Sequence, residues 1–314
     1  MRVSSSAPTR ISLAGGGCDL PIFYEKHGGL VISLAINIRQ EMIIETGIDA
    51  HTKSSIPEGS SQQFYRAIIK ELGFKDSEVQ IQAKFDGKIQ SGLGTSASAA
   101  VALVAGLTRA RGTNLDPEQT AELAWDIEVN REKMYGGKQD QYAAAFGGMN
   151  TFYFTEMGVL TCPWERQVAK ELEEVLMLFH TGIIRSDTKI QEQFLTLSES
   201  QTIELEKIRT NAMTLIGGLE SGDWKFVGHI ISEGWEHKKK SNPKVTSPEI
   251  DKIYDTAMLS GAYGGKLCGS GGGGYIFFIV PPDKQDKVMM NLMSQGCFPV
   301  DFSVDYQGVS SRIL

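Results

Sequence analysis

The chain has 314 residues, a length that exceeds one small core and suits two closely packed lobes. A formal net charge of -7 provides no general attraction for nucleic acid, so we expect no nucleic-acid partner and a local site for any anionic ligand. The apolar runs fall short of the ~20 residues that cross a bilayer and no secretion signal opens the chain, so we expect a cytoplasmic protein with no membrane partner.

Hydrophobic periodicity and turn residues predict strands and helices along the whole chain. In the first half we expect strands over residues 2–14, 30–46, 79–85 and 149–154, and helices over 64–72, 96–111 and 117–127. In the second half we expect a strand over 174–180, helices over 187–219, 223–240, 249–260 and 283–295, a strand, glycine loop and strand over 264–280, and a strand over 299–304. No linker separates these segments, so we expect two lobes, 1–170 and 171–314, that share a cleft.

A glycine turn feeds an alanine-rich helix in the segment from Gln90 to Ala100. Gly92 and Gly94 let the backbone approach an anion, and the unpaired amides at the helix start point at it. The hydroxyls that follow add hydrogen-bond donors or a magnesium ligand. This pattern favours a phosphate site, and a tight turn with hydroxyl caps before a buried helix is the structural alternative.

Two more glycine clusters follow strand-like segments or lead into them. The turn Gly15-Gly16-Gly17 ends near the carboxylate of Asp19, and four consecutive glycines precede the strand that begins at Tyr275. Either cluster suits an ordinary strand connection. Four consecutive glycines, however, raise the entropy cost of folding and contribute no packing, so we expect a close backbone approach there.

The cysteines, the histidines and one basic run show no catalytic pattern. Four cysteines lie far apart without a metal-ligand pair, so we expect reduced thiols. Five histidines show no spacing of a metal site or relay. The run from His237 to Lys240 is typical of a solvated helix end that the helix dipole stabilises.

The three glycine segments together resemble the GHMP kinase superfamily, named for galactokinase, homoserine kinase, mevalonate kinase and phosphomevalonate kinase. That family carries an amino-terminal substrate segment, a central Gly-Leu-Gly-Ser-Ser-Ala loop and a late glycine-rich connection in this order; here Thr95 stands where serine is usual. The segments that begin at Ser6, Gly136 and Thr181 resemble the heptose kinases of the family, with Cys18 where threonine is expected. The resemblance implies an α+β fold of two lobes with an ATP and substrate cleft between them.

The resemblance also implies roles for individual residues in a phosphoryl transfer that uses ATP and Mg2+. Asp140 would accept or orient the proton of the acceptor hydroxyl, and Lys138 would screen its charge. Magnesium would be bound by Ser96 and Glu128. The residues expected to bind ATP are Ser91, Gly92, Leu93, Gly94, Thr95, Ser96, Ala97 and Ser98. The residues expected to bind the substrate are Arg10, Gly16, Gly17, Asp19, Asp140, Arg185, Gly271 and Gly272.

Several of these residues have a structural interpretation as well. Glu128 suits a solvent-facing acid beside Arg131 or Glu132, and Asp140 suits a helix cap. Arg10 suits an ion-pair partner of Asp19. In the same way, Lys138 could be a solvated loop residue, and Arg185 could be a surface residue at the start of a helix.

The expected function is that of a kinase that phosphorylates a heptose phosphate, D-glycero-D-manno-heptose 7-phosphate, to the 1,7-bisphosphate. The alternatives are a kinase for another sugar or polyol, such as fucose, galactose or inositol, and a non-catalytic nucleotide-binding family member. A dinucleotide-binding oxidoreductase is disfavoured, because position 20 lacks the third glycine and Pro21 would interrupt an early helix. The expected partner is a small sugar or sugar phosphate; the oligomeric state stays open, a homodimer included.

Overall fold

The computed structural model describes residues 1–47, 62–85, 87, 92–184 and 196–314. Its strands are β1 (Arg2–Ala14), β2 (Gly29–Thr46), β3 (Val79–Phe85), β4 (Met149–Thr155), β5 (Gly158–Pro163), β6 (Leu176–His180), β7 (Gly264–Leu267), β8 (Tyr275–Ile279), β9 (Phe298–Val300) and β10 (Ser310–Ile313). Its α-helices are α1 (Pro21–His27), α2 (Gln62–Glu71), α3 (Thr95–Ala110), α4 (Pro117–Trp125), α5 (Gln139–Phe146), α6 (Arg166–Val175), α7 (Glu199–Ser221), α8 (Trp224–Ser241), α9 (Pro248–Ser260) and α10 (Gln285–Ser294).

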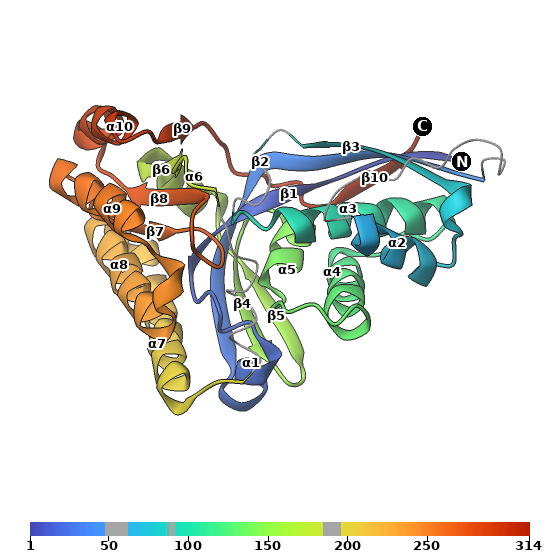
Figure 1. The fold of residues 1–314 in the computed structure, drawn as a ribbon, viewed down its shortest axis with the longest axis horizontal. Coiled ribbons are helices and arrows are strands. Elements are labelled where there is room, and N and C mark those ends of the chain that lie inside the picture. The colour runs from blue at the N-terminus through green and yellow to red at the C-terminus, as the bar shows by residue number, and fades with distance from the viewer. Residues whose placement is uncertain (48–61, 86, 88–91, 185–195) are drawn as a thin grey trace.

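Two antiparallel sheets organise the described residues (Figure 1). The first sheet has the strand order β10-β1-β2-β4-β5, with β3 paired to β2, and α2, α3, α4 and α5 lie beside it. The second sheet has the order β7-β8-β6-β9 and carries α7 to α10 around it. This mixture of antiparallel sheets and helices agrees with the expected α+β fold.

The first lobe owes its stability to a rod of small apolar residues. Helix α3 is buried from Ala97 to Thr108, because alanine and glycine let it approach β1 and β2 closely. At Gly106 an added Cβ would lie 2.4 Å from Ile44 Cδ1, which shows how closely the helix meets the sheet. Helix α3 is therefore held rigidly on the sheet, together with the segment at its start, residues 92–98, which we call the phosphate loop after the role expected of it.

The two lobes share part of their core. One apolar cluster contains Ile11 and Leu34 of the first sheet together with Leu215 of α7 and Phe277 of β8. Strand β10 also returns from the end of the chain to pair with β1, with Ser4 opposite Arg312. The expected boundary is therefore wrong for the last residues, which belong to the first sheet.

Most of the expected elements are present, and local signals explain where they begin and end. Asp116 caps α4 by accepting a hydrogen bond from the Gln119 amide at 2.8 Å. The expectation that Pro21 interrupts an early helix is wrong, because Pro21 is the first residue of α1, where a proline needs no amide partner. The start of the expected helix at 187–219 lies outside the described residues, and α6 and β5 were not expected.

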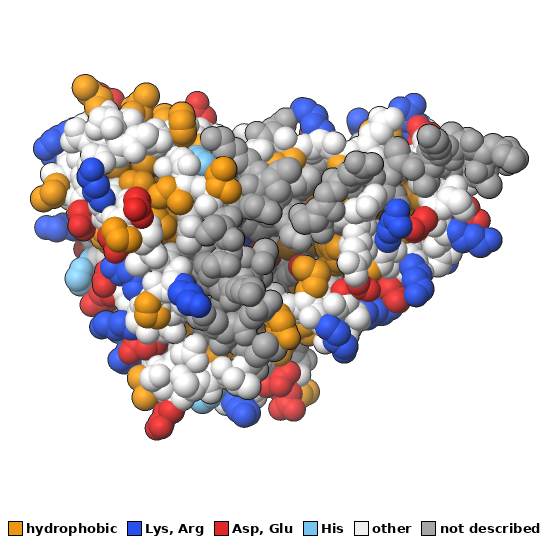
Figure 2. Space-filling view, viewed as in Figure 1, with side chains coloured by type: hydrophobic (Ala, Val, Ile, Leu, Met, Phe, Trp, Pro, Cys, Tyr) orange, Lys and Arg blue, Asp and Glu red, His pale blue; other side chains and the backbone are white. Residues whose placement is uncertain are grey.

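The charges on the surface follow no single sign. Figure 2 shows Lys and Arg side chains interspersed with Asp and Glu over this face of both lobes. Within the part of the chain that the structure describes, no helix combines the length and apolar character needed to span a membrane.

Candidate active site

The start of α3 presents backbone amides without partners inside the helix. Gly94 precedes the helix with a φ of +72°, and no described side chain caps it. The first amide with a partner in the helix is that of Ser98, which donates to the Gly94 carbonyl at 2.9 Å. The backbone amides of Thr95, Ser96 and Ala97 can therefore donate hydrogen bonds to an anion.

The side chains of two residues in this segment anchor it to the rest of the protein. Ser98 is fully buried and its hydroxyl donates to the Ala7 carbonyl at 2.8 Å, so the prediction that Ser98 contacts phosphate is wrong. Leu93 buries its side chain in the shared core, and its carbonyl accepts the Arg10 amide at 3.0 Å. Ser91 lies outside the described residues.

The late glycine loop, residues 269–274 between β7 and β8, contacts the phosphate loop. An added Cβ at Gly92 would lie 2.5 Å from the Cys268 carbonyl oxygen, and one at Gly269 would lie 2.5 Å from Gly92 Cα. Lys238 of α8 donates to the Gly269 carbonyl, so the basic run is not merely a solvated helix end. This contact joins the two lobes. The close approach expected at the four consecutive glycines is also present, since an added Cβ at Gly273 would lie 2.8 Å from the Ile183 carbonyl oxygen.

Gly271 and Gly272, which are expected to bind the substrate, both lie against Val245. An added Cβ at Gly271 would lie 2.6 Å from Val245 Cβ, and the Gly272 amide donates to the Val245 carbonyl at 2.8 Å. The substrate contacts expected of these glycines stay a prediction. Arg185, the other substrate residue expected from the second lobe, lies outside the described residues.

Asp140 on α5 faces the phosphate loop and is held there by Arg10. Arg10 Nε and Nη2 lie 2.7 and 2.6 Å from Asp140 Oδ1, while Nη1 donates to the Gly92 carbonyl at 2.6 Å. An added Cβ at Gly94 would lie 3.1 Å from Asp140 Oδ2, which accepts no hydrogen bond from the described residues. Both structural alternatives are wrong, because Asp140 caps no helix and Arg10 does not pair with Asp19.

Lys138 does not serve the role expected of it. Its ammonium lies 2.7 and 2.8 Å from the two carboxylate oxygens of Glu122 and 4.3 Å from the centre of the Trp125 ring. The cation beside Asp140 is Arg10. The prediction that Lys138 screens Asp140 is therefore wrong, since Glu122 on α4 captures the ammonium.

Asp19 joins the amino-terminal glycine turn to the start of α5. It is 3% exposed and accepts hydrogen bonds from the Gly17 amide at 3.1 Å, the Gln139 amide at 3.1 Å and Gln139 Nε2 at 3.0 Å. Burial, followed by the charge of Asp140, raises the pKa of Asp19 to about 6. These bonds bring Asp19 and the turn that carries Gly16 beside Asp140.

Glu128 lies on a π-helical segment, Asp126–Arg131, that continues α4. Gln141 Nε2 donates to its carboxylate at 2.6 Å. Burial, with a smaller effect of the Asp140 charge, raises the pKa of Glu128 to about 7. Glu128 is half-buried, and Arg131, its neighbour in the structural alternative, pairs with Asp126 and Glu71 instead.

The residues present suit a magnesium ion and a nucleotide phosphate. Thr95 Oγ1 and Gln141 Oε1 are buried and lack a hydrogen-bond partner among the described residues. Glu128 is a half-buried carboxylate that forms no ion pair with the described residues, while Ser96 is exposed at the helix start. In the described ranges no three His, Cys, Asp or Glu side chains gather as a metal cage, so the protein would supply a partial set of oxygen ligands.

Sequence reasoning missed several residues that orient the site. Gln139 and Gln141 flank Asp140 and hold Asp19 and Glu128, respectively. Their signal is local, since three polar residues open the otherwise apolar helix α5. The roles of Glu122 and Lys238 have no local signal, because their partners lie far away in the chain.

Comparison with known proteins supports the geometry. The GHMP kinases N terminal domain matches residues 62–148 and the GHMP kinases C terminal domain matches residues 215–294. The chain is 29% identical to a D-glycero-alpha-D-manno-heptose 7-phosphate kinase of Campylobacter jejuni, over 98% of each protein. It is 27% identical to a galactokinase of Pyrococcus furiosus, over 74% of this chain and 73% of that one.

A solved structure shares the whole fold. The structure of a D-glycero-D-manno-heptose 1-phosphate kinase from Bacteroides thetaiotaomicron superposes with a TM-score of 0.77 at 28% identity, over 99% of both chains. Both family domains thus occur in the expected order, and relatives named as kinases match nearly the full length. The chain therefore belongs to the GHMP kinase family and is a phosphotransferase that acts on a hydroxyl group.

Proposed function

We propose that this protein is an ATP-dependent sugar kinase of the cytoplasm that converts D-glycero-D-manno-heptose 7-phosphate to the 1,7-bisphosphate. One observation carries the proposal. Asp140 Oδ2 lies without a protein hydrogen bond, among the described residues, against Gly94 at the start of the phosphate-loop helix. A carboxylate oxygen in that position can accept a proton beside the place where phosphate would bind.

Arg10 orients this carboxylate. Two of its guanidinium nitrogens contact Oδ1, and a third donates to the Gly92 carbonyl, so Asp140 and the phosphate loop share one rigid partner. In the transfer the acceptor hydroxyl loses its proton to Asp140 Oδ2 while its oxygen bonds to the γ-phosphorus and the bond to ADP breaks. ATP and Mg2+ supply the phosphoryl group and its charge neutralisation when bound, with Ser96 and Glu128 as the proposed ligands of Mg2+.

The acceptor is proposed from chemistry and from the relatives together. The amino-terminal turn, with Gly16, Gly17 and Asp19, lies on one side of Asp140. A polyol would find a carboxylate acceptor and backbone groups there. The similar heptose kinases support a heptose phosphate, although their names differ in the position of the phosphate. The similarity to a galactokinase favours an unphosphorylated hexose as the second candidate.

A coupled ADP-release assay tests the proposal. The panel contains heptose 7-phosphate, heptose, mannose, fucose, galactose and inositol with ATP and Mg2+. We expect selective turnover of heptose 7-phosphate, and we expect Asp140→Asn to lower kcat by ~100- to 10,000-fold, the usual contribution of a general base. Asp255→Asn, at an exposed position of α9, is the matched control and should retain full activity. Turnover of another sugar alone would reject the heptose, and no turnover would reject the kinase proposal for this panel.

A further inference from the structure

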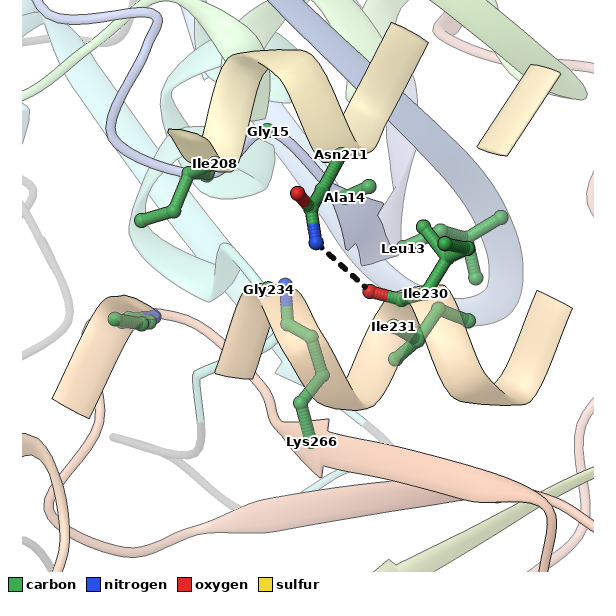
Figure 3. A pocket seen from close by; sticks show the side chains of 11 residues that line it. Leu13, Ala14, Gly15, Ile208, Asn211, Ile230, Ile231, Gly234 and Lys266 are labelled. Atoms are coloured by element: carbon green, nitrogen blue, oxygen red, sulfur yellow. Dashed lines mark hydrogen bonds between the residues drawn. The ribbon is translucent and has the colours of Figure 1, made fainter. Parts of the chain in front are cut away.

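Lys266 is a buried lysine that the proposed mechanism does not use. It lies on β7, is 6% exposed, and extends past Gly234 into the space between α7 and α8 (Figure 3). There it lines a cavity of about 20 Å³. A cavity needs at least ~10–15 Å³ to hold a water molecule, so this one accepts a single oxygen-sized group.

The ammonium of Lys266 has no anionic partner among the described residues. Burial lowers the pKa of Lys266 to about 8. The ionisable groups that act on its ammonium are Cys268, Arg10 and Cys18. Burial raises the pKa of Cys268 to about 11 and that of Cys18 further, so both are neutral thiols. Arg10 carries the same charge as Lys266. A buried cation without a counter-ion is costly, and the cost falls when an anion binds beside it.

The walls of the cavity connect it with the active site. Its lining includes the backbone of Gly15 and Gly16 and also Lys238, which donates to the late glycine loop at Gly269. An added Cβ at Gly16 would lie 3.9 Å from Gln139 Nε2, the group that donates to Asp19. Gly16 of the amino-terminal turn thus lines the Lys266 cavity and also lies near Gln139, the partner of Asp19.

We propose that the Lys266 cavity is an anion subsite that receives one terminal oxygen of a phosphate group. The remaining walls combine apolar side chains, such as Leu13 and Ile231, with the amide of Asn211, so Lys266 and Lys238 supply positive charge and the apolar walls limit the access of water. The phosphate belongs to the acceptor sugar or to the nucleotide, both of which carry this group. The inference deepens the proposed function, on which it rests for the identity of the acceptor.

Binding measurements without turnover test the subsite. Isothermal titration calorimetry would compare heptose 7-phosphate, unphosphorylated heptose and ADP on the wild type, Lys266→Met and Lys266→Arg. Lys240→Met, at an exposed lysine of α8, is the matched control. We expect Lys266→Met to weaken the phosphate ligand by at least ~10-fold, the effect of losing one charge-assisted hydrogen bond, while heptose binding stays unchanged. Lys266→Arg keeps the charge and should retain part of the preference.

The outcomes distinguish the two sources of the phosphate group, and they distinguish failure of the subsite from failure of the proposed function. A loss confined to heptose 7-phosphate assigns the subsite to the acceptor, and a loss confined to ADP assigns it to the nucleotide. Unchanged binding of both by Lys266→Met overturns the subsite. If the wild type binds phosphate ligands through Lys266 but turns over no sugar in the panel, the proposed function fails and the subsite stands. Lys266→Met removes an uncompensated buried charge, so thermal unfolding should show no loss of stability.

Discussion

Asp19 gives the site a pH dependence that stability measurements can detect. Its pKa is raised from an ordinary 3.8 to about 6, because burial and the neighbouring Asp140 disfavour the charged form. Between these two values the folded protein keeps a proton that the unfolded chain has released. The contribution of Asp19 to the free energy of unfolding therefore decreases by about 2 kcal/mol as the pH rises from 4 to 7.

The variant Asp19→Asn removes this titration. We expect the free energy of unfolding of the wild type, relative to Asp19→Asn, to fall by that amount between pH 4 and pH 7 in urea denaturation. The exposed control Asp255→Asn should keep a constant difference from the wild type over the same range. A pH-independent difference for Asp19→Asn would contradict the raised pKa.

Lys138 should matter for stability and little for catalysis. Its ammonium is bound by Glu122, whose carboxylate also accepts a 2.5 Å hydrogen bond from the Tyr142 hydroxyl. We expect Lys138→Met to cost about 1–3 kcal/mol, since a charged hydrogen bond is lost and Glu122 is left without its cation. Chemical denaturation gives the cost. Steady-state kinetics should show kcat within ~3-fold of the wild type, because the Lys138 ammonium contacts Glu122 and Trp125 and does not orient Asp140.

Arg10→Met provides the comparison for Lys138→Met. It removes the cation that contacts Asp140 and the phosphate loop, so kcat should fall far more than in Lys138→Met. An equal loss of kcat in both variants would restore the catalytic role first expected of Lys138.

At the scale of the elements, the contact between the two glycine loops joins the start of α3 to the loop between β7 and β8. Gly269 has a φ of +65° and lies against Gly92, whereas Gly296 has a φ of +83° and faces open space. A Cβ at either position costs about 1–2 kcal/mol in backbone strain. Only the Cβ of Gly269→Ala would also push the late loop away from the phosphate loop.

The pair Gly269→Ala and Gly296→Ala therefore isolates the loop contact. We expect Gly269→Ala to lose more stability than Gly296→Ala in thermal unfolding, because its Cβ would lie 2.5 Å from Gly92 Cα. We also expect a raised KM for ATP and a lowered kcat in Gly269→Ala alone. Lys238→Met, which removes the donor to the Gly269 carbonyl, should shift the same kinetic constants in the same direction. Unchanged kinetics in Gly269→Ala would show that the loop contact has no part in nucleotide binding.

At the scale of the whole molecule, the end of the chain is tied to the first sheet by a buried ion pair. Arg39 of β2 contacts Asp305 and donates to the Gly308 carbonyl at 2.7 Å, with the two paired side chains 13% and 7% exposed. Strand β10 follows and pairs with β1. The second half of the chain thus contributes directly to the first lobe.

Loss of this pair should destabilise both lobes together. We expect Arg39→Met to cost about 3–5 kcal/mol, because it leaves the Asp305 carboxylate buried without its cation. Arg2→Met, which breaks an exposed pair with Glu45, should cost no more than about 1 kcal/mol. Urea denaturation followed by fluorescence and circular dichroism should give one transition in each case, because one apolar cluster spans both sheets. Separate transitions would show that the lobes fold independently.

The sequence by itself determined the elements whose signals are local. Gly92 and Gly94 adopt positive φ in the phosphate loop, and Asp116 caps α4. These features depend on sterics and hydrogen bonds within a few residues, so their pattern can be recognised without knowing the fold. The three glycine segments are local patterns too, so their order along the chain could predict the family without knowledge of the fold.

Only the tertiary structure decided which charged groups meet. Asp140 pairs with Arg10, which is 130 residues away, and not with the nearby Lys138. Likewise, Lys238 reaches Gly269, and β10 crosses back to β1. These contacts follow from strand register and from the packing of α4, α5 and α8, and such long-range geometry leaves no periodic pattern in the residues that take part.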